Sequence, residues 1–370
     1  MRRTNQVPRF IHNFHTILYD KADNFSSHKT ENIMFSPRKL GARGETLKQI
    51  STILNNKNDV NHRDISDYTE IINHLFLDEQ TRQYEINGTF IDELKDQYNC
   101  DIELIDFQQQ AVVLEKVNLL IQGQTGNGFP KKYLPLNTTM LFINYVYFKA
   151  MWLFQFEKHD TSNNHEFYTD QDDIISNYTL MFVRRPFRYS DLTSELGAQI
   201  VHLPLINDYE SSIKFVFTIV LPNRNVKLID VLTKIMNRRQ QRLLSFNSAP
   251  HHYKQIDLYL PKLSIKSFFD LKSYLIELGM KDAFDSNQAD FSVITLRSGR
   301  QLFLENVVHT TMLNVNEVGI EEASLAFNTG PLPMCDMNPD VEFKCDRPFF
   351  FMINEIKTDA ILFMGKYSLP

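Results

Sequence analysis

Residues 140–149, MLFINYVYFK, carry the clearest structural signal, because β-branched and aromatic residues dominate this segment. Such residues favour strands, and a long apolar run of this kind is typical of a strand buried in a sheet. Further apolar or alternating runs occupy 214–221, 302–304 with 307–308, 349–353 and 360–364. A sheet is therefore the dominant prediction for this chain.

Helical periodicity is confined to fewer segments. Apolar residues recur at helical spacing over 9–19, over 113–121 before Gly123, and over 271–278 before Gly279. Helices are expected in the first third and near 225–280, with strands elsewhere and no regular βαβ alternation. That distribution predicts the α+β class. Because no repeat or low-complexity linker divides the sequence, residues 1–370 are expected to form a single domain.

Composition excludes several classes of protein. The 370 residues carry a formal net charge of −6, with 43% apolar and 23% charged residues, which is a globular composition. The mild acidity argues against nucleic acid as a partner. No apolar run approaches the ~18 residues that cross a bilayer, so a soluble chain without membrane contact is expected.

The cysteines and the amino terminus bear on the compartment. Cys100, Cys335 and Cys345 are an odd number, so reduced thiols are expected rather than a disulfide framework. No apolar stretch of a signal peptide follows Met1, which is typical of a cytoplasmic protein. Four glycosylation sequons leave the extracellular space open: those beginning at Asn24, Asn87, Asn137 and Asn177.

Motifs of catalysis are missing from the sequence. It contains no HExxH, CxxC, G-x-S-x-G or GK[ST] motif, so we expect no enzyme, no cofactor and no metal site. Residues 319–340, GIEEASLAFNTGPLPMCDMNPD, instead predict a loop of unusual length. Loops this long in compact domains are usually functional or disordered, and a flexible surface connection without a function is the alternative.

An ordered set of segments resembles the serpins. Asn32–Pro37 (NIMFSP) resembles an early strand of that family, and Asn144–Trp152 (NYVYFKAMW) its N-A-x-Y-F-K-G-x-W signature, with Ala150 in place of Gly. The remaining matches follow in order: Pro261–Leu263, Leu278–Met280, Ala283–Phe284, Ala289–Ser292, Val308–His309, Val315–Gly319, Asp346–Phe349 and Phe363–Lys366. The final Ser368-Leu369-Pro370 and the start resemble the intracellular, ovalbumin-like branch.

This resemblance implies a large central mixed sheet, further sheets, about seven to nine helices and an exposed reactive loop at about 319–340. It implies a monomeric inhibitor of serine or cysteine endopeptidases, which acts when its cleaved loop inserts into the sheet and traps the acylated protease. The loop hinge would comprise Glu317, Gly319, Ile320, Glu321, Glu322, Ala323, Ser324 and Ala326. The shutter and breach, which open for insertion, would include Ser36, Asn144, Trp152 and His309.

The position of the reactive bond depends on the alignment. Counting fourteen residues from Gly319, as the family pattern suggests, places cleavage after Pro333, whereas aligning the downstream prolines places it near Met334 or Cys335. Proline is a poor residue to cleave after, so Met334 is favoured and Leu332 is second. No Lys or Arg lies between Gly319 and Asp340, so a chymotrypsin-like or elastase-like partner is expected.

Three departures from the family pattern keep a non-inhibitory alternative open. Ile320 and Glu322 would turn inward on insertion, where serpins prefer small residues, and an unpaired buried carboxylate costs several kcal/mol. Only Arg38 and Lys39 separate Pro37 from Leu40, where the family has a helix, so a tolerated deletion, an alternative transcript or a faulty gene model is expected. The short, mixed-charge stretch 55–67 argues against glycosaminoglycan binding. A substrate, carrier or binding partner with this fold is the alternative.

Overall fold

In the computed structural model the described residues form two compact units. Unit 1 comprises those within 29–147 and 266–312, and unit 2 those within 23–28, 148–265 and 313–370. The structure describes residues 25–27, 41–54, 68–125, 134–171, 173–206, 213–235, 242–247, 252–299, 301–320, 338–357, 359 and 361–368.

Unit 1 is built on a sheet in the order β11-β12-β4-β2-β3. β12 and β4 pair in parallel from Leu304↔Met140 to Met312↔Tyr147, and β2 pairs in parallel with β3. The strands of this sheet are β2 (Thr69–Asp78), β3 (Cys100–Ile105), β4 (Met140–Phe148), β11 (Leu263–Asp270) and β12 (Leu304–Val315).

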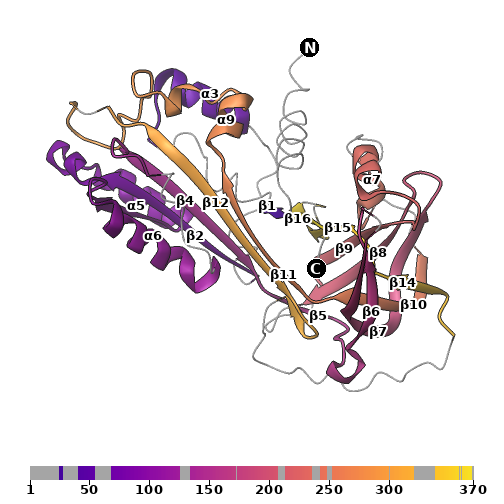
Figure 1. Cartoon of the computed structure of the whole chain (residues 1–370). Helices are drawn as coiled ribbons and strands as arrows, with labels where there is room; N and C mark the ends of the chain where they lie inside the picture. Colours follow the sequence, from indigo (N-terminus) through magenta and orange to yellow (C-terminus); the bar gives the residue numbers. More distant parts are fainter. Residues whose placement is uncertain are drawn as a thin grey trace, which may run out of the picture. The chain divides into compact units, whose positions relative to one another are not determined.

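Helices cover both faces of this sheet. Phe76, Leu141 and Ile143 pack with Val113 and Val117 of helix α6, which runs alongside β2 and β4 in Figure 1. The alternate residues of the same strands pack in a second cluster with α3, α5 and α9, as expected when successive side chains point to opposite faces. The helices are α3 (Gly44–Leu54), α5 (Gly88–Tyr98), α6 (Gln110–Thr125) and α9 (Lys272–Leu278), with 3-10 turns at Glu79–Tyr84 and Asp282–Phe284.

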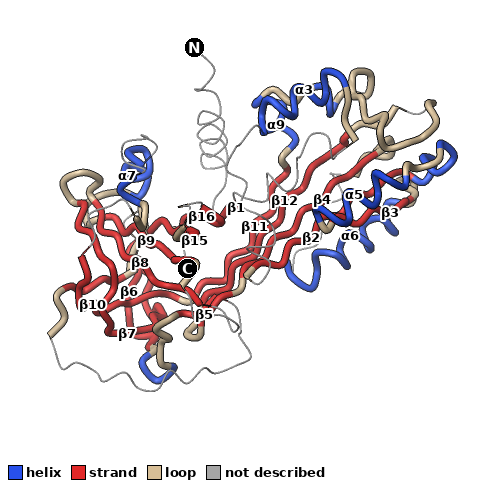
Figure 2. The backbone as a smooth tube through the Cα atoms, turned by 180° about the vertical axis from the view of Figure 1, so that it is seen from behind, coloured by secondary structure: helices blue, strands red, loops and turns tan. Residues whose placement is uncertain are grey.

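Unit 2 consists mainly of strands (Figure 2). One series runs β1-β16-β15-β9-β8-β5-β13, and a second continues from β8 through β7 to β10 and β14, with β6 paired to β7. The strands are β1 (Phe25–Ser27), β5 (Ala150–Trp152), β6 (Ser162–Tyr168), β7 (Ile174–Leu192), β8 (Ala198–Ile206), β9 (Phe215–Pro222), β10 (His252–Pro261), β13 (Gly319–Ile320), β14 (Val341–Lys344), β15 (Phe349–Glu355) and β16 (Ile361–Tyr367).

Little helix accompanies these strands in the described part of unit 2. Helix α7 (Leu228–Ile235) buries Leu228, Val231, Leu232 and Ile235 on one side, which is the pattern of a surface helix. Short 3-10 turns occupy Lys158–Asp160 and Arg242–Leu244.

The predicted α+β class and large mixed sheet are confirmed. Strands β4, β9, β12, β15 and β16 match the predicted segments, and α6 and α9 match two predicted helices. Helices α7 and α9 lie in the region near 225–280 where helices were expected, but residues 252–270 between them form β10 and β11. β10 is a strand because it pairs with β7 and β14, which are distant in sequence. The predicted helix over 9–19 lies outside the described residues, so the helix count stays a prediction.

Two of the three cysteines, Cys100 and Cys345, lie among the described residues. Cys100 and Cys345 are buried free thiols, as predicted, and burial raises the pKa of both, to about 12 for Cys100. Cys335 lies outside the described residues. Among the helices that the structure describes, none is long and apolar enough to span a bilayer.

Candidate functional site

The expected hinge begins in a tight turn after β12. Asn316 organises this turn, because its Oδ1 accepts hydrogen bonds from the backbone N–H groups of Val318 (2.9 Å) and Gly319 (3.2 Å). Asn316 also donates its own backbone N–H to the carbonyl of Gly319 (2.9 Å). An Asn side chain bonded to the backbone two residues ahead is a common turn device. The turn reverses the chain into β13.

Strand β13 lies between two other strands. Ile320 pairs with Val315 of β12, and Gly319 and Ile320 pair with Met151 and Ala150 of β5, all antiparallel. The side chain of Ile320 is buried. The first two residues of the predicted loop, Gly319 and Ile320, are therefore part of the sheet.

Trp152 fixes the same turn from β5. Its indole Nε1 donates to the carbonyl of Asn316 (2.8 Å), and its backbone N–H donates to the carbonyl of Val318 (3.0 Å). The indole is buried and makes edge-to-face contacts with Phe156 and Phe217 at centroid distances of 6.0 and 5.5 Å. Buried tryptophan usually finds a hydrogen-bond partner for its N–H, and here that partner is the hinge turn.

An ion pair with the half-exposed Lys262 anchors the buried side chain of Glu317. Its Oε1 lies 2.7 Å from Nζ of Lys262 and accepts from Oγ1 of Thr161 at 3.0 Å, while only 7% of its side chain is exposed. Burial opposes ionisation of this carboxyl, but the hydrogen bonds from Lys262, its own backbone N–H and Thr161 outweigh it and lower the pKa. Glu317 is thus held as a carboxylate at the start of the expected hinge.

The expected shutter residues meet inside unit 1. His309 of β12 lies opposite Asn144 of β4, and its Nδ1 is 2.6 Å from Oδ1 of Asn144. Nδ2 of Asn144 donates to Oδ1 of Asn73 on β2 (2.8 Å), so the Asn144 oxygen is the acceptor and Nδ1 of His309 carries the proton. Three strands are thereby joined by side chains. Burial lowers the pKa of His309 to about 3, which keeps the ring neutral.

The structure groups the described site residues into two clusters. Trp152, Glu317, Gly319 and Ile320 come together in unit 2, and Asn144 and His309 in unit 1. The other predicted site residues lie outside the described residues: Ser36, Glu321, Glu322, Ala323, Ser324, Ala326, Leu332, Pro333, Met334 and Cys335.

The sequence prediction missed four residues of these clusters. Lys262 and Asn316 stand within segments that matched the family, so a search for partners of Glu317 and Gly319 could have found them. Thr161 and Asn73 carry no comparable signal, because each acts through a contact between residues far apart in sequence. Within the described ranges no group of three or more His, Cys, Asp or Glu side chains could hold a metal ion.

Comparison with known proteins agrees with this geometry. The sequence model of one family, Serpin (serine protease inhibitor), matches residues 12–370. The chain belongs to the serpin family. Members of this family include protease inhibitors, and relatives from the ovalbumin-like branch are among those that this chain matches.

Two curated relatives illustrate the degree of similarity. This serpin is 29% identical over 375 residues to a leukocyte elastase inhibitor of Xenopus tropicalis, which covers 93% of this chain and 94% of the relative. It is 30% identical over 315 residues to Serpin B13 of Mus musculus, with 82% of this chain and 75% of the relative covered.

Solved serpin structures share the fold. A serpin from the trematode Schistosoma haematobium superposes with a TM-score of 0.79 at 23% identity, covering 99% of this chain and 100% of the other. Uncleaved ovalbumin gives a TM-score of 0.78 at 22% identity, with 99% and 98% covered.

Proposed function

We propose that this serpin is a suicide inhibitor of a serine endopeptidase with an apolar specificity pocket, of the chymotrypsin-like or elastase-like kind. The observation that carries the proposal is the strand pairing of β12. It pairs directly with β4 over Leu304–Met312, while the hinge already pairs with its end at Val315. Because β13 contributes only two residues to the sheet, residues that follow it could extend it into a full strand.

The direction of β13 supports insertion. β13 runs antiparallel to β12 and pairs with β5, which follows β4 in the chain. Lengthening β13 beyond Ile320 would require β4 and β12 to separate and would replace their parallel pairing with two antiparallel ones, which are slightly more stable per residue. About a dozen new ladder bonds at about 1 kcal/mol each would supply about 10 kcal/mol. That is comparable to the stability of a whole domain.

The residue before the reactive bond and the class of target protease are inferred from the sequence of the loop. Met334 is the favoured residue before the reactive bond, with Leu332 second and Pro333 and Cys335 as neighbours, and each of the first two suits an apolar pocket. The elastase inhibitors among the relatives support this choice of partner. The inhibitor would act as a single domain and as a monomer.

Incubation with chymotrypsin or pancreatic elastase tests the proposal. We expect a covalent complex that survives SDS, together with a large rise in the melting temperature of the cleaved serpin. Trypsin serves as the control protease, because residues 320–339 contain no Lys or Arg, so it should form no such complex through the loop. Clean cleavage without complex by both apolar proteases would contradict the proposal.

A non-inhibitory role is the second candidate, and Glu322 favours it. Ile320 is buried, and residues 320 and 322 share one face of an extended strand, so insertion would bury the Glu322 carboxylate. An insertion delayed in this way lets the acyl-enzyme hydrolyse first, which would make the serpin a substrate. In that case the melting temperature would rise on cleavage although no complex forms.

A further inference from the structure

A cavity of about 470 Å³ opens in unit 2, away from the hinge turn. The β6–β7 connection, the turn after β9 and the turn between β14 and β15 form its walls, with Tyr168, Ile174, Arg224, Lys227, Arg347 and Pro348 among the lining residues. Its volume falls in the range of small-molecule sites, about 300–1,000 Å³.

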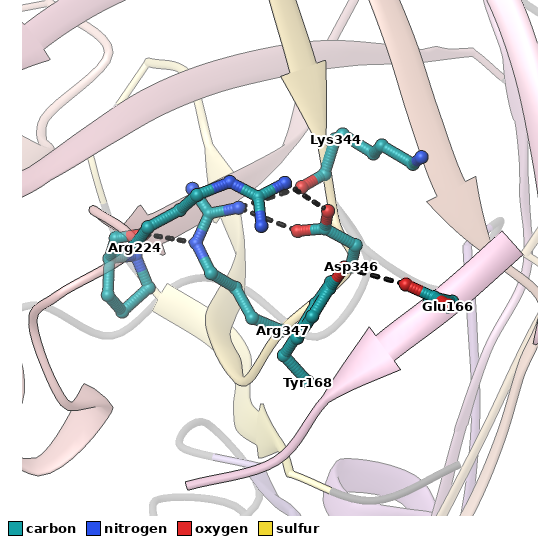
Figure 3. Close-up of polar contacts among 7 residues, drawn as sticks. Glu166, Tyr168, Arg224, Lys344, Asp346 and Arg347 are labelled. Carbon is teal, nitrogen blue, oxygen red and sulfur yellow. Dashed lines mark hydrogen bonds and ion pairs between the residues drawn. The ribbon is translucent and has the colours of Figure 1, made fainter. Parts of the chain in front are cut away.

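One buried carboxylate holds two arginines at this cavity. The side chain of Asp346 is 1% exposed, and its Oδ2 accepts from Nη2 of Arg224 (2.8 Å) while Oδ1 accepts from Nη1 of Arg347 (2.7 Å). Figure 3 shows both guanidinium groups converging on this carboxylate. The two cations are therefore positioned before any ligand arrives.

Arg347 is fixed by further bonds. Its Nε donates to the carbonyl of Pro222 (2.6 Å). Its Nη1 also donates to the carbonyl of Lys344 (3.3 Å), as Figure 3 shows. Only 15% of the Arg347 side chain is exposed. A guanidinium held in this way loses little conformational freedom when it binds an anion.

Arg224 is more open and lies against an aromatic ring. Its guanidinium carbon is 5.2 Å from the centroid of Tyr168, whose hydroxyl donates to Glu166 (2.7 Å) and whose backbone N–H donates to the carbonyl of Asp346 (2.8 Å). The Arg224 side chain is 60% exposed. A guanidinium has five N–H donors, of which Asp346 takes one, so donors remain for a ligand.

Among the described residues that line the cavity, positive charge exceeds negative charge. Arg224, Arg347 and Lys227 stand against the carboxylates of Asp346 and Asp170, and Asp170 is exposed to solvent. Among the described residues no carboxylate forms an ion pair with Lys227, so none of them neutralises its charge. An anion from solution would compensate this excess of positive charge. A phosphate group suits the site because it offers several oxygens to a cluster of cations.

We propose that this cavity binds a small organic phosphate, independently of the proposed protease inhibition. The phosphate lies between Arg224 and Lys227, with Arg347 supporting Arg224 through the shared Asp346. The organic part packs on the apolar side of the lining, where Ile174 is 56% exposed beside Pro348. An inorganic anion would leave that apolar surface in water, so an organic ester fits better.

Calorimetric titration of the whole chain with phenyl phosphate tests this site, with inorganic phosphate as the second probe. We expect binding of one phenyl phosphate per chain with a dissociation constant of about 1 mM or lower, and weaker binding of inorganic phosphate. Arg224→Gln and Lys227→Gln should each weaken phenyl phosphate binding about tenfold, because each removes one charge-assisted contact.

Arg297→Gln is the matched control, because Arg297 is 71% exposed, pairs with the Glu85 carboxylate and lies in unit 1. It should leave binding unchanged. Lys227→Gln removes no ion pair among the described residues, so this variant should still fold. It therefore tests phosphate binding even if Arg224→Gln fails to fold. Absence of saturation at about 10 mM phenyl phosphate, equal affinity for both probes, or an unchanged affinity in Lys227→Gln would overturn the proposal.

Discussion

Nδ1 of His309 lies 2.6 Å from Oδ1 of Asn144, across the parallel pair that β12 forms with β4. The ring of His309 also stacks on Phe269, at a centroid distance of 6.1 Å and an interplanar angle of 19°. Both side chains are buried, so the hydrogen bond joins two strands inside the core of unit 1. Any separation of β4 from β12 must break it.

The depressed pKa of His309 predicts a pH dependence of stability. Burial lowers that pKa from 6.5 to about 3, so between these values the unfolded chain binds a proton that the folded chain does not. The contribution of neutral His309 is therefore full above pH 6.5 and decreases as the pH falls toward 3, with a limiting slope of about 1.4 kcal/mol per pH unit.

Chemical denaturation between pH 7.5 and 5 can measure this effect in the parent protein and in His309→Gln. Because burial also lowers the pKa of His74 and His165, the informative quantity is the difference between the two curves. The parent should lose stability more steeply than the variant as the pH falls. His159→Gln is the control, since the His159 side chain is 78% exposed, and it should keep the parent's slope. Parallel curves for parent and His309→Gln would contradict the burial argument.

The ion pair of Glu317 predicts a loss of stability when either partner is neutralised. Glu317→Gln and Lys262→Met should each lower the free energy of unfolding by about 1–3 kcal/mol, because one charged hydrogen bond is lost inside a partly buried site. The double variant should cost less than the sum of the single variants, as expected for residues in contact. Urea denaturation at pH 7 measures all three.

The exposed pair Lys95–Asp101 provides the comparison for that cycle. Its atoms are 3.3 Å apart, but the two side chains are 67% and 62% exposed, so Lys95→Met should cost less than about 1 kcal/mol.

The contribution of Glu317 itself should be present above the ordinary pKa of a glutamate and disappear as the pH falls below it, because its pKa in the folded protein is lowered. Additive single variants would show that Glu317 and Lys262 act separately.

The sequence predicted most completely those elements whose signal is local. The apolar run 140–149 became β4, whose every residue is buried, and the helix before Gly279 ends there because Gly279 adopts the left-handed φ of 113°. β10 was missed, although Ile256, Leu258 and Leu260 alternate with less apolar neighbours. Its partners are β7 and β14, and pairing over such distances in sequence leaves little local trace.

The candidate site divides in the same way. His309, Asn144, Trp152 and Glu317 were identified because their segments resemble a family pattern, and the structure gives each a specific contact. Their partners Asn73 and Thr161 could not be predicted, because a lone polar residue acquires a role only when segments distant in sequence come together in the fold. Residue types within a motif are readable from one sequence, whereas contacts between distant segments are not.

Gly319 is expected to tolerate no larger side chain. A Cβ at this position would overlap the carbonyl oxygen of Ala150 and lie 2.6 Å from Cα of Met151, both backbone atoms that cannot easily move. Gly319→Ala should therefore destabilise the protein by about 1–3 kcal/mol through overpacking. It should also speed proteolysis of the loop, because β13 would leave its place beside β5. Thermal unfolding and a time course with chymotrypsin measure the two effects.

Gly88→Ala is the control for that substitution. Gly88 is the first residue of α5, and no atom of the described residues lies within 4 Å of a Cβ built there. Alanine should stabilise this helix by up to about 1 kcal/mol and leave proteolysis of the loop unchanged. Equal stability changes at Gly88 and Gly319 would show that the backbone contact at Ala150 is unimportant.

The burial of Ile320 predicts which substitution in the proposed hinge should speed insertion of the loop. Ile320 is buried, and alternate residues of an extended strand share a face, so Glu322 would be carried inward on insertion while Glu321 would point outward. Glu322→Ala should lower the barrier to insertion, and each 1.4 kcal/mol removed would raise the insertion rate about tenfold. The measured quantity is the ratio of SDS-stable complex to cleaved serpin after reaction with elastase. Glu321→Ala removes the same charge from the opposite face and should leave the ratio unchanged. An equal gain in both variants would mean that net charge, rather than burial of one carboxylate, limits the inhibitor.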